Sequence, residues 1–200
     1  MNWTTDHTIL YKIGKHGVYH KDVAAFDLDH TLIKPKDGRK FPQDKDDWEW
    51  FHPKVPLYLK CAAKYWTVMI VSNQAGISKG KTDKDDIIYK INSVLKKLGL
   101  DNDVSVFIST KSDYNRKPSN LIMDFALDKL SLKELADSKS FYCGDAAGRI
   151  EQRGYSKKDF SCSDRKFAYN CNIEFFTPEE LFTSKEVKLD SIPWEWGSKS

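Results

Sequence analysis

The sequence has few cysteines, no long apolar run and almost no excess of charge of one sign. None of its four cysteines belongs to a C-x-x-C pair, and we interpret all four as reduced thiols of an intracellular protein without a structural zinc site: Cys61, Cys143, Cys162 and Cys171. No apolar run approaches the roughly 20 residues that span a membrane, and residues 1–6 show no secretion signal. The net charge of +3 is too small to indicate a nucleic-acid partner by itself. We therefore interpret the protein as globular. Its length of 200 residues suits a single domain with a substantial core.

The most informative stretch is a short apolar run that stops at two aspartates. Residues 23–26 are typical of a buried strand, and Asp27 and Asp29 follow them directly. In β/α sheets, the chemistry lies just beyond the carboxyl ends of the strands. Two neighbouring carboxylates repel each other, so a metal cation or a shared proton is needed to hold them together. An isolated D-x-D is as often an ordinary turn, but this one follows a buried-strand pattern, which favours a functional site.

Elsewhere the chain alternates strand patterns with helical patterns. Strands are predicted over residues 67–71, 104–108, 140–143 and 173–176, and helices over residues 55–65, 83–98, 121–130 and a short segment starting at Ser163. Residues 177–180 have the pattern of a capping box with proline at the first helical position. Strands that alternate with helices favour an α/β fold with a Rossmann-like parallel sheet sandwiched by helices.

Three segments lie outside this alternation. Residues 1–21 are predicted to form an N-terminal β-hairpin, in which residues 9–11 and 18–19 flank the turn at residues 14–17. Residues 34–53 form a polar and aromatic loop that is too short for a folded cap domain, and residues 183–200 form a C-terminal tail. We therefore expect a single domain over residues 1–200 with a minimal cap or none.

Polar side chains follow four of the predicted strands and should meet at one edge of the sheet. They are Asp27 with Asp29, Ser72, Lys117 on the loop after the third strand, and Asp145. Two or three carboxylates make a magnesium site, since this cation takes oxygen ligands and shares them with phosphate. A lysine and a hydroxyl bind phosphate oxygens, so the set suits phosphoryl transfer to a carboxylate nucleophile. Each residue alone fits an ordinary strand end, loop or turn, but their combination in this order favours an active site.

The order D-x-D-x-T, Ser72, Lys117 and Gly-Asp resembles the haloacid dehalogenase (HAD) superfamily of phosphatases. The closer resemblance is to the 3′-phosphatase domain of polynucleotide kinase 3′-phosphatases, a group of DNA-end repair enzymes. The most specific blocks are Gly144–Arg149 and Asp159–Arg165, and the resemblance runs from about Trp3 to Phe182. It implies a HAD-like fold and a magnesium-dependent phosphatase.

The resemblance also assigns roles to individual residues. Asp27 would attack phosphorus and become an aspartyl phosphate, while Asp29 would protonate the leaving 3′-oxygen and then activate water. Magnesium would be held by Asp27, the backbone carbonyl of Asp29 and Asp145, with Asp164 as nearby support. Ser72 and Lys117 would bind the transferring phosphoryl group. The residues expected to contact substrate are Thr31, Asn73, Gln74, Lys79, Arg116 and Arg149.

Two departures from the family pattern leave substrate preference open. His30 stands where many relatives have glycine, and Lys79 stands where an arginine is common. Neither departure removes a catalytic group.

The resemblance further implies that the substrate is a DNA strand end with a 3′-phosphate and that the protein acts in the nucleus, and we expect a monomer. Short loops would leave an open cleft that suits a strand end, and basic residues beside the motifs could meet its phosphates: Arg39, Lys40, Lys79, Lys81, Arg116, Arg149, Arg153, Lys157 and Lys158. Such charges are also ordinary on a solvated surface. Trp48, Trp50 and Phe51 could stack a base, but we favour packing in the core for each of them.

The sequence disfavours two other functions and contains one misleading motif. A small-metabolite phosphatase for histidinol or heptose phosphates usually carries a Cys/His zinc loop, which this sequence lacks. A module that binds DNA ends without turnover is disfavoured by the intact set of catalytic residue types. Residues 76–82 look like a P-loop, but three residues separate their glycines where four are required, so no kinase activity is expected.

Overall fold

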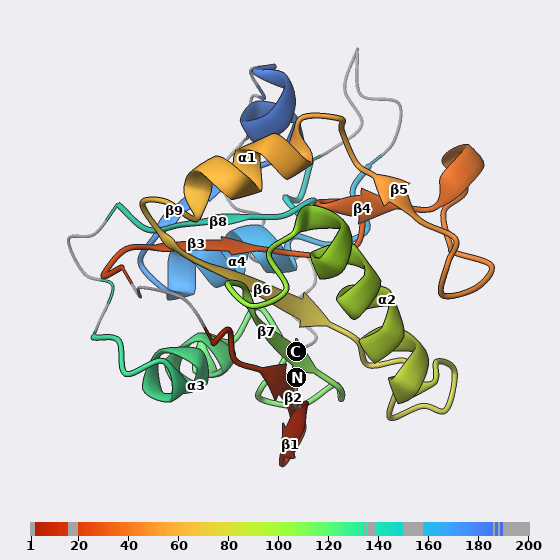
Figure 1. The fold of residues 1–200 in the computed structure, drawn as a ribbon, viewed down its shortest axis with the longest axis horizontal. Coiled ribbons are helices and arrows are strands. Elements are labelled where there is room, and N and C mark those ends of the chain that lie inside the picture. The colour runs from red at the N-terminus through yellow and green to blue at the C-terminus, as the bar shows by residue number, and fades with distance from the viewer. Residues whose placement is uncertain are drawn as a thin grey trace.

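A seven-stranded sheet forms the centre of the protein (Figure 1). The computed structural model describes residues 3–15, 20–133, 135, 139–149, 158–185, 187 and 189. The strands of this sheet are β1 (Thr4–Asp6), β2 (Ile9–Lys12), β3 (Val23–Phe26), β6 (Thr67–Asn73), β7 (Ser105–Ser109), β8 (Phe141–Cys143) and β9 (Glu174–Phe176). They lie in the order β1-β2-β7-β6-β3-β8-β9.

Five of these strands run parallel, and β3 lies in the middle of them. It pairs with β6 on one side and with β8 on the other, while β6 continues to β7 and β8 continues to β9. The prediction of a parallel α/β sheet is therefore confirmed, with strands close to the predicted positions. Because parallel strands end at the same edge, the residues after β3, β6, β7 and β8 come together there.

Helices cover both faces of the sheet. They are α1 (Val55–Ala62), α2 (Lys84–Leu98), α3 (Leu121–Lys129) and α4 (Ser163–Asn170). The apolar stripes of α1 and α2 pack into one core cluster, and those of α3 and α4 pack into a second cluster on the other face. None of the helices in the described part of the chain is long and apolar enough to span a membrane.

The helix ends follow the local signals in the sequence. The side chain of Asp83 accepts a hydrogen bond of 2.7 Å from the backbone N–H of Asp85 and so caps α2. Gly99 ends the same helix with a φ of 69°, a conformation that favours glycine. The predicted capping box is present, since Thr177 N–H donates to the carboxylate of Glu180 (2.8 Å) and Glu180 N–H donates to the hydroxyl of Thr177 (3.3 Å). It starts a π-helical turn, Glu179–Thr183.

The N-terminal hairpin exists, but its predicted turn is wrong. The chain reverses at His7 and Thr8, so β1 pairs with β2, and residues 9–11 belong to the second arm of the hairpin. β2 then pairs antiparallel with β7, which covers the open edge of the parallel sheet and buries Leu10. Pairing with this distant strand sets the register, which a local turn signal does not reveal. The other predicted arm, residues 18–19, lies outside the described part of the chain.

The loop after β3 folds into a small flap rather than a cap domain. It holds a short antiparallel pair, β4 (Ile33–Lys34) and β5 (Glu49–Trp50), with a 3₁₀ turn at Lys36–Gly38 between them. The buried carboxylate of Asp47 fastens the loop by accepting from the backbone of Gln43 (2.7 Å) and Lys36 (3.1 Å). The aromatic residues Trp48, Trp50 and Phe51 pack against the core, which agrees with the core interpretation.

Candidate active site

The catalytic edge of the sheet begins where β3 ends. Backbone N–H of Asp27 still donates to the carbonyl of Cys143 on β8 (2.8 Å), so this residue is held in line with the strand. The chain then turns, because the carbonyl of Leu28 accepts from the N–H groups of Leu32 (3.0 Å) and Ile33 (3.1 Å). In this turn His30 has a φ of 58°, which explains why glycine suits the position.

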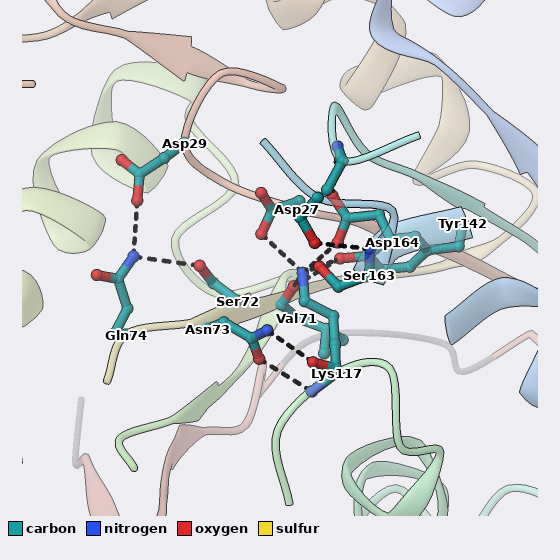
Figure 2. Close-up of polar contacts among 12 residues, drawn as sticks. Asp27, Asp29, Val71, Ser72, Asn73, Gln74, Lys117, Tyr142, Ser163 and Asp164 are labelled. Carbon is teal, nitrogen blue, oxygen red and sulfur yellow. Dashed lines mark hydrogen bonds and ion pairs between the residues drawn. The ribbon is translucent and has the colours of Figure 1, made fainter. Parts of the chain in front are cut away.

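The side chain of Lys117 lies at the centre of the site (Figure 2). Its Nζ is 2.9 Å from Oδ1 of Asp27 and 2.8 Å from Oδ1 of Asp164. It also donates to the carbonyl of Val71 (3.0 Å) and the hydroxyl of Tyr142 (2.5 Å), and only 2% of the side chain is exposed. Burial lowers the pKa of Lys117, but the charges of Asp164 and Asp27 outweigh this and raise the pKa overall. The lysine is therefore a fixed positive charge at the strand ends.

Three carboxylates gather around this lysine. One oxygen each of Asp27, Asp145 and Asp164 can be chosen so that all three lie within 4.8 Å of one another. Burial raises the pKa of Asp27 to about 7, which Lys117 opposes and Asp164 reinforces. Burial, together with the charges of Asp164 and Asp27, also raises the pKa of Asp145 well above its usual range. The cluster thus holds more negative charge than its surroundings compensate, and its oxygen ligands are those that a hard divalent cation prefers.

Asp164 is already committed to contacts within the protein. Its Oδ1 pairs with Lys117, and its Oδ2 accepts a hydrogen bond from the backbone N–H of Ala146 (3.0 Å). The side chain is 2% exposed and lies in the first turn of α4. The resemblance implies a supporting role for Asp164 beside the metal, and this role stays a prediction.

Asp29 points away from the carboxylate cluster, toward α2 (Figure 2). Its Oδ2 accepts from Nε2 of Gln74 (2.6 Å), which also donates to Oγ of Ser72 (3.2 Å). Its Oδ1 is 3.1 Å from Nζ of Lys90. Partial burial raises the pKa of Asp29, but the charge of Lys90 and the hydrogen bond from Gln74 lower it by more. Gln74, predicted to contact substrate, here links Asp29 to Ser72.

Two further side chains predicted to contact substrate hold the backbone of the site instead. The side-chain amide of Asn73 binds the main chain of Lys117, because its oxygen accepts from the N–H of Lys117 (3.0 Å) and its NH₂ group donates to the carbonyl of Lys117 (3.1 Å). The guanidinium of Arg149 pairs with Asp159 (2.9 Å) and Glu179 (2.8 Å) and donates to the carbonyl of Asp145 (3.1 Å). Their contacts with substrate stay predictions.

The other predicted contact residues differ in exposure. Thr31 is fully buried, and its hydroxyl has no hydrogen-bond partner among the described residues. Arg116 is half-buried, which lowers its pKa, whereas Lys79 and Lys81 are exposed on the turn before α2. Arg39 pairs with Asp47 (3.1 Å). Arg153 and Lys157 lie outside the described residues.

Sequence reasoning missed two residues of the site, Lys90 and Tyr142. Lys90 lies on the apolar face of α2, one turn from Ile87 and Val94, and is buried. A charged residue within an apolar stripe was the signal that could have revealed it. Tyr142 falls in the middle of a strand pattern, where a buried aromatic residue is ordinary, so nothing in the sequence marked it.

Gly144 leaves no room for a side chain next to Asp164. A methyl group at this position would lie 2.5 Å from Cγ and 2.6 Å from Cβ of Asp164. Because Asp164 is fixed by Lys117 and Ala146, we expect Gly144→Ala to displace it and lower kcat/KM on the order of 100-fold, the effect of a misplacement of about 1 Å. Phosphate-release kinetics and a thermal melt of the same preparation measure this. Unchanged turnover in the variant would contradict the steric account.

Comparisons with known proteins agree with this geometry. A family model described as "Polynucleotide kinase 3 phosphatase" matches residues 22–182. An uncharacterized 20.8 kDa protein of Autographa californica nuclear polyhedrosis virus is 36% identical over 90% of this chain and 96% of its own length. The "Polynucleotide 3′-phosphatase" of Saccharomyces cerevisiae is 30% identical over 84% of this chain and 90% of its own length. The "Bifunctional polynucleotide phosphatase/kinase" of Schizosaccharomyces pombe is 36% identical over 91% of this chain, which spans only 42% of that protein.

Solved structures show the same fold at low sequence identity. A HAD-like phosphatase from Mesorhizobium loti has a TM-score of 0.63 at 17% identity and covers 85% of this chain and 78% of its own. A D,D-heptose 1,7-bisphosphate phosphatase from B. bronchiseptica, complexed with magnesium and phosphate, has a TM-score of 0.57 at 15% identity and covers 84% of this chain and 88% of its own. At these identities the likeness concerns the fold alone.

Proposed function

Because the chain belongs to the polynucleotide kinase 3 phosphatase family, we propose that this phosphatase removes the 3′-phosphate from DNA strand ends and leaves a 3′-hydroxyl. The observation that carries the proposal is the buried contact of Lys117 with Asp27 and Asp164, beside Asp145, at the carboxyl edge of a HAD-like sheet. Repair of strand breaks inside the nucleus is part of the same proposal.

Asp27 is the nucleophile in this reaction. One of its carboxylate oxygens attacks phosphorus while the bond from phosphorus to the 3′-oxygen breaks, which leaves an aspartyl phosphate. Lys117 offsets the negative charge between Asp27 and the phosphoryl group. Ser72, which Gln74 links to Asp29, would donate a hydrogen bond to a phosphoryl oxygen.

Asp29 moves the protons. It gives its proton to the leaving 3′-oxygen in the first step. In the second step it takes a proton from the water that attacks phosphorus, while the bond from phosphorus to Asp27 breaks and inorganic phosphate leaves. Lys90 and Gln74 favour its ionised form, which is the base needed in the second step. An arriving phosphate brings negative charge close to Asp29 and so raises its pKa, which favours the protonated form for the first step.

The donor set fits magnesium. Asp27 and Asp145, with the backbone carbonyl of Asp29, would hold the ion, and Asp164 would support them from its contact with Lys117. Magnesium, when bound, would offset the negative charge of the carboxylates and of the phosphoryl oxygens.

Magnesium is expected to raise the melting temperature more at pH 8 than at pH 6. The pKa of Asp27 is about 7 in the metal-free fold, above its unfolded value, so the metal-free protein loses stability as pH rises through this range. Protons also compete with the ion below pH 7. Thermal melts with magnesium, or with sodium chloride of equal ionic strength, measure the difference at each pH. An equal shift at both values would contradict this assignment of the ligands.

An open cleft with exposed basic residues suits a polymer better than a small metabolite. A cavity of about 230 Å³ lies between the flap and the start of α2, and residues 42–45, 81–83, 86–87 and 90 line it. Lys90 connects this cavity to Asp29, the residue that faces the leaving group in the proposed reaction. A strand end would therefore lie on the side of Asp29, next to Lys81, which lines the cavity, and on the same exposed turn as Lys79.

Lys79→Ala is expected to weaken binding of oligonucleotides and to flatten their salt dependence. Each phosphate contact adds about 0.7 to the log–log slope for single strands. Hydrolysis of a small aryl phosphate should barely change, because that substrate reaches only the catalytic edge. The measurement is kcat/KM for both substrates across a salt series. Lys139→Ala is the matched control, since this exposed lysine precedes β8 at the opposite edge of the sheet. Equal losses on both substrates would favour a small-metabolite phosphatase.

The deciding experiment for the function is phosphate release from a 3′-phosphorylated oligonucleotide, compared with its 5′-phosphorylated isomer and a small phosphomonoester. Each substrate is tested with and without magnesium. We expect rapid release from the 3′-phosphate only when magnesium is present. A preference for the small phosphomonoester would overturn the nucleic-acid assignment, and no release from any substrate would overturn the catalytic one.

A further inference from the structure

Lys117 has to be held in place by other residues, because neither its backbone nor its side chain is fixed by regular structure. It lies on the loop between β7 and α3, and its ammonium must reach Asp27 across the end of the sheet. A lysine side chain has four rotatable bonds, and a loop backbone moves more than a strand. The structure shows one uncharged side chain at each end of this residue that limits this freedom, in addition to the ion pairs of the ammonium with Asp27 and Asp164.

The first contact fixes the backbone of Lys117. Asn73 is the last residue of β6, and its side chain accepts from the N–H of Lys117 (3.0 Å) and donates to its carbonyl (3.1 Å). This pair of bonds is what a neighbouring strand would supply to an edge residue. Only a side chain with one donor and one acceptor in the same plane can form this pair of bonds. A carboxylate of the same shape cannot, because it lacks the donor.

The second contact fixes the ammonium. The hydroxyl of Tyr142 donates its single hydrogen to the carbonyl of Val71 (2.8 Å), so it can only accept from Lys117 Nζ, which lies 2.5 Å away. The ring of Tyr142 is fully buried and packs edge-on against Phe167, with 4.9 Å between their centroids. This packing fixes the position of the hydroxyl oxygen.

The geometry also shows what the hydroxyl prevents. Four oxygens lie within hydrogen-bond distance of Lys117 Nζ, which has three hydrogens. With the hydroxyl present, Lys117 shares its three hydrogens among Asp27, Asp164, the phenol oxygen and the carbonyl of Val71, which also accepts from Tyr142. Without it, the acceptor on the side of Tyr142 is lost and Val71 keeps Lys117 as its side-chain donor, so the ammonium shifts toward β6.

We propose that Asn73 and Tyr142 are positioning residues for Lys117, the first for its backbone and the second for its ammonium, and that neither contacts substrate. The proposal rests on the proposed function, because it assigns Lys117 to the reacting phosphoryl group. It reassigns Asn73, which the sequence suggested as a substrate contact.

The test uses Asn73→Asp, Tyr142→Phe and the double variant in the full chain. Asn73→Asp should lower kcat/KM by about 100-fold, as a displacement near 1 Å does, and Tyr142→Phe by about 10-fold. Each factor should be the same for a 3′-phosphorylated oligonucleotide and an aryl phosphate, because both place the same phosphoryl group against Lys117. The double variant should lose less than the product of the two factors, since both changes displace one ammonium.

Two control variants remove equivalent groups away from Lys117. Asn92→Asp keeps the oxygen that accepts from Trp3, and Tyr58→Phe removes a hydroxyl from a half-buried ring that packs against Phe182. Both should retain wild-type turnover. If Asn73→Asp does not fold in a thermal melt, Asn73→Ser replaces it, because serine removes both bonds without adding a charge.

The outcomes separate the inference from the proposed function. If the wild-type protein releases no phosphate from either substrate, the proposed function is wrong. An active wild type with variants inside a twofold range overturns the inference alone. A loss on the oligonucleotide only would make Asn73 or Tyr142 a strand contact, and a double variant equal to the product would make their effects independent; both results overturn it.

Discussion

Asp27→Asn is expected to leave less than about 1% of wild-type turnover in a protein that still folds. The amide is a poor nucleophile, and loss of a covalent step typically costs several orders of magnitude. The fold should persist, because Asp27 N–H keeps its bond to Cys143 and the neutral amide removes repulsion from Asp164. Phosphate release at saturating substrate and circular dichroism of the same sample give the two readings. Residual activity above this level in a folded variant would point to another nucleophile.

Lys117→Ala is expected to damage both turnover and stability. Removing the ammonium leaves Asp27 and Asp164 buried without their cation, and breaking a buried ion pair in this way typically costs about 3–5 kcal/mol of unfolding free energy. We expect kcat/KM to fall on the order of 1,000-fold for the oligonucleotide and for a small aryl phosphate alike, because both react through the same phosphoryl group. Urea denaturation and steady-state kinetics on both substrates measure these effects.

The matched control for Lys117→Ala is Lys111→Ala. Lys111 lies on the same loop, but its side chain is exposed. This variant should keep wild-type stability and kcat/KM for the aryl phosphate. If Lys117→Ala lost activity on the oligonucleotide alone, Lys117 would be a strand contact rather than part of the phosphoryl site.

The sheet and the main members of the site could be predicted because their signals are local. Short apolar runs marked the parallel strands, and their alternation with helices indicated that the sheet is parallel. Asp27, Ser72, Lys117 and Asp145 follow those strands, so one rule about parallel sheets was enough to place them at a common edge.

The parts that could not be predicted depend on contacts between residues far apart in the chain. The hairpin turn was misplaced because pairing of β2 with β7, about one hundred residues later, decides the register. Arg149 carries the charge expected of a substrate contact, but it forms ion pairs with Asp159 and Glu179. Only the fold brings these three side chains together. Lys90 meets Asp29 from 61 residues away, which no local pattern shows.

The central position of β3 has a consequence for local opening of the fold. With β6 on one side and β8 on the other, the backbone that carries Asp27 belongs to the last part of the sheet to open, and its amide hydrogens should exchange only on global unfolding. The flap follows the same strand in the chain and is held by a pair of two-residue strands, β4 and β5. Opening this short pair requires far less free energy than opening the sheet. Opening of the flap should therefore leave the nucleophile in its position.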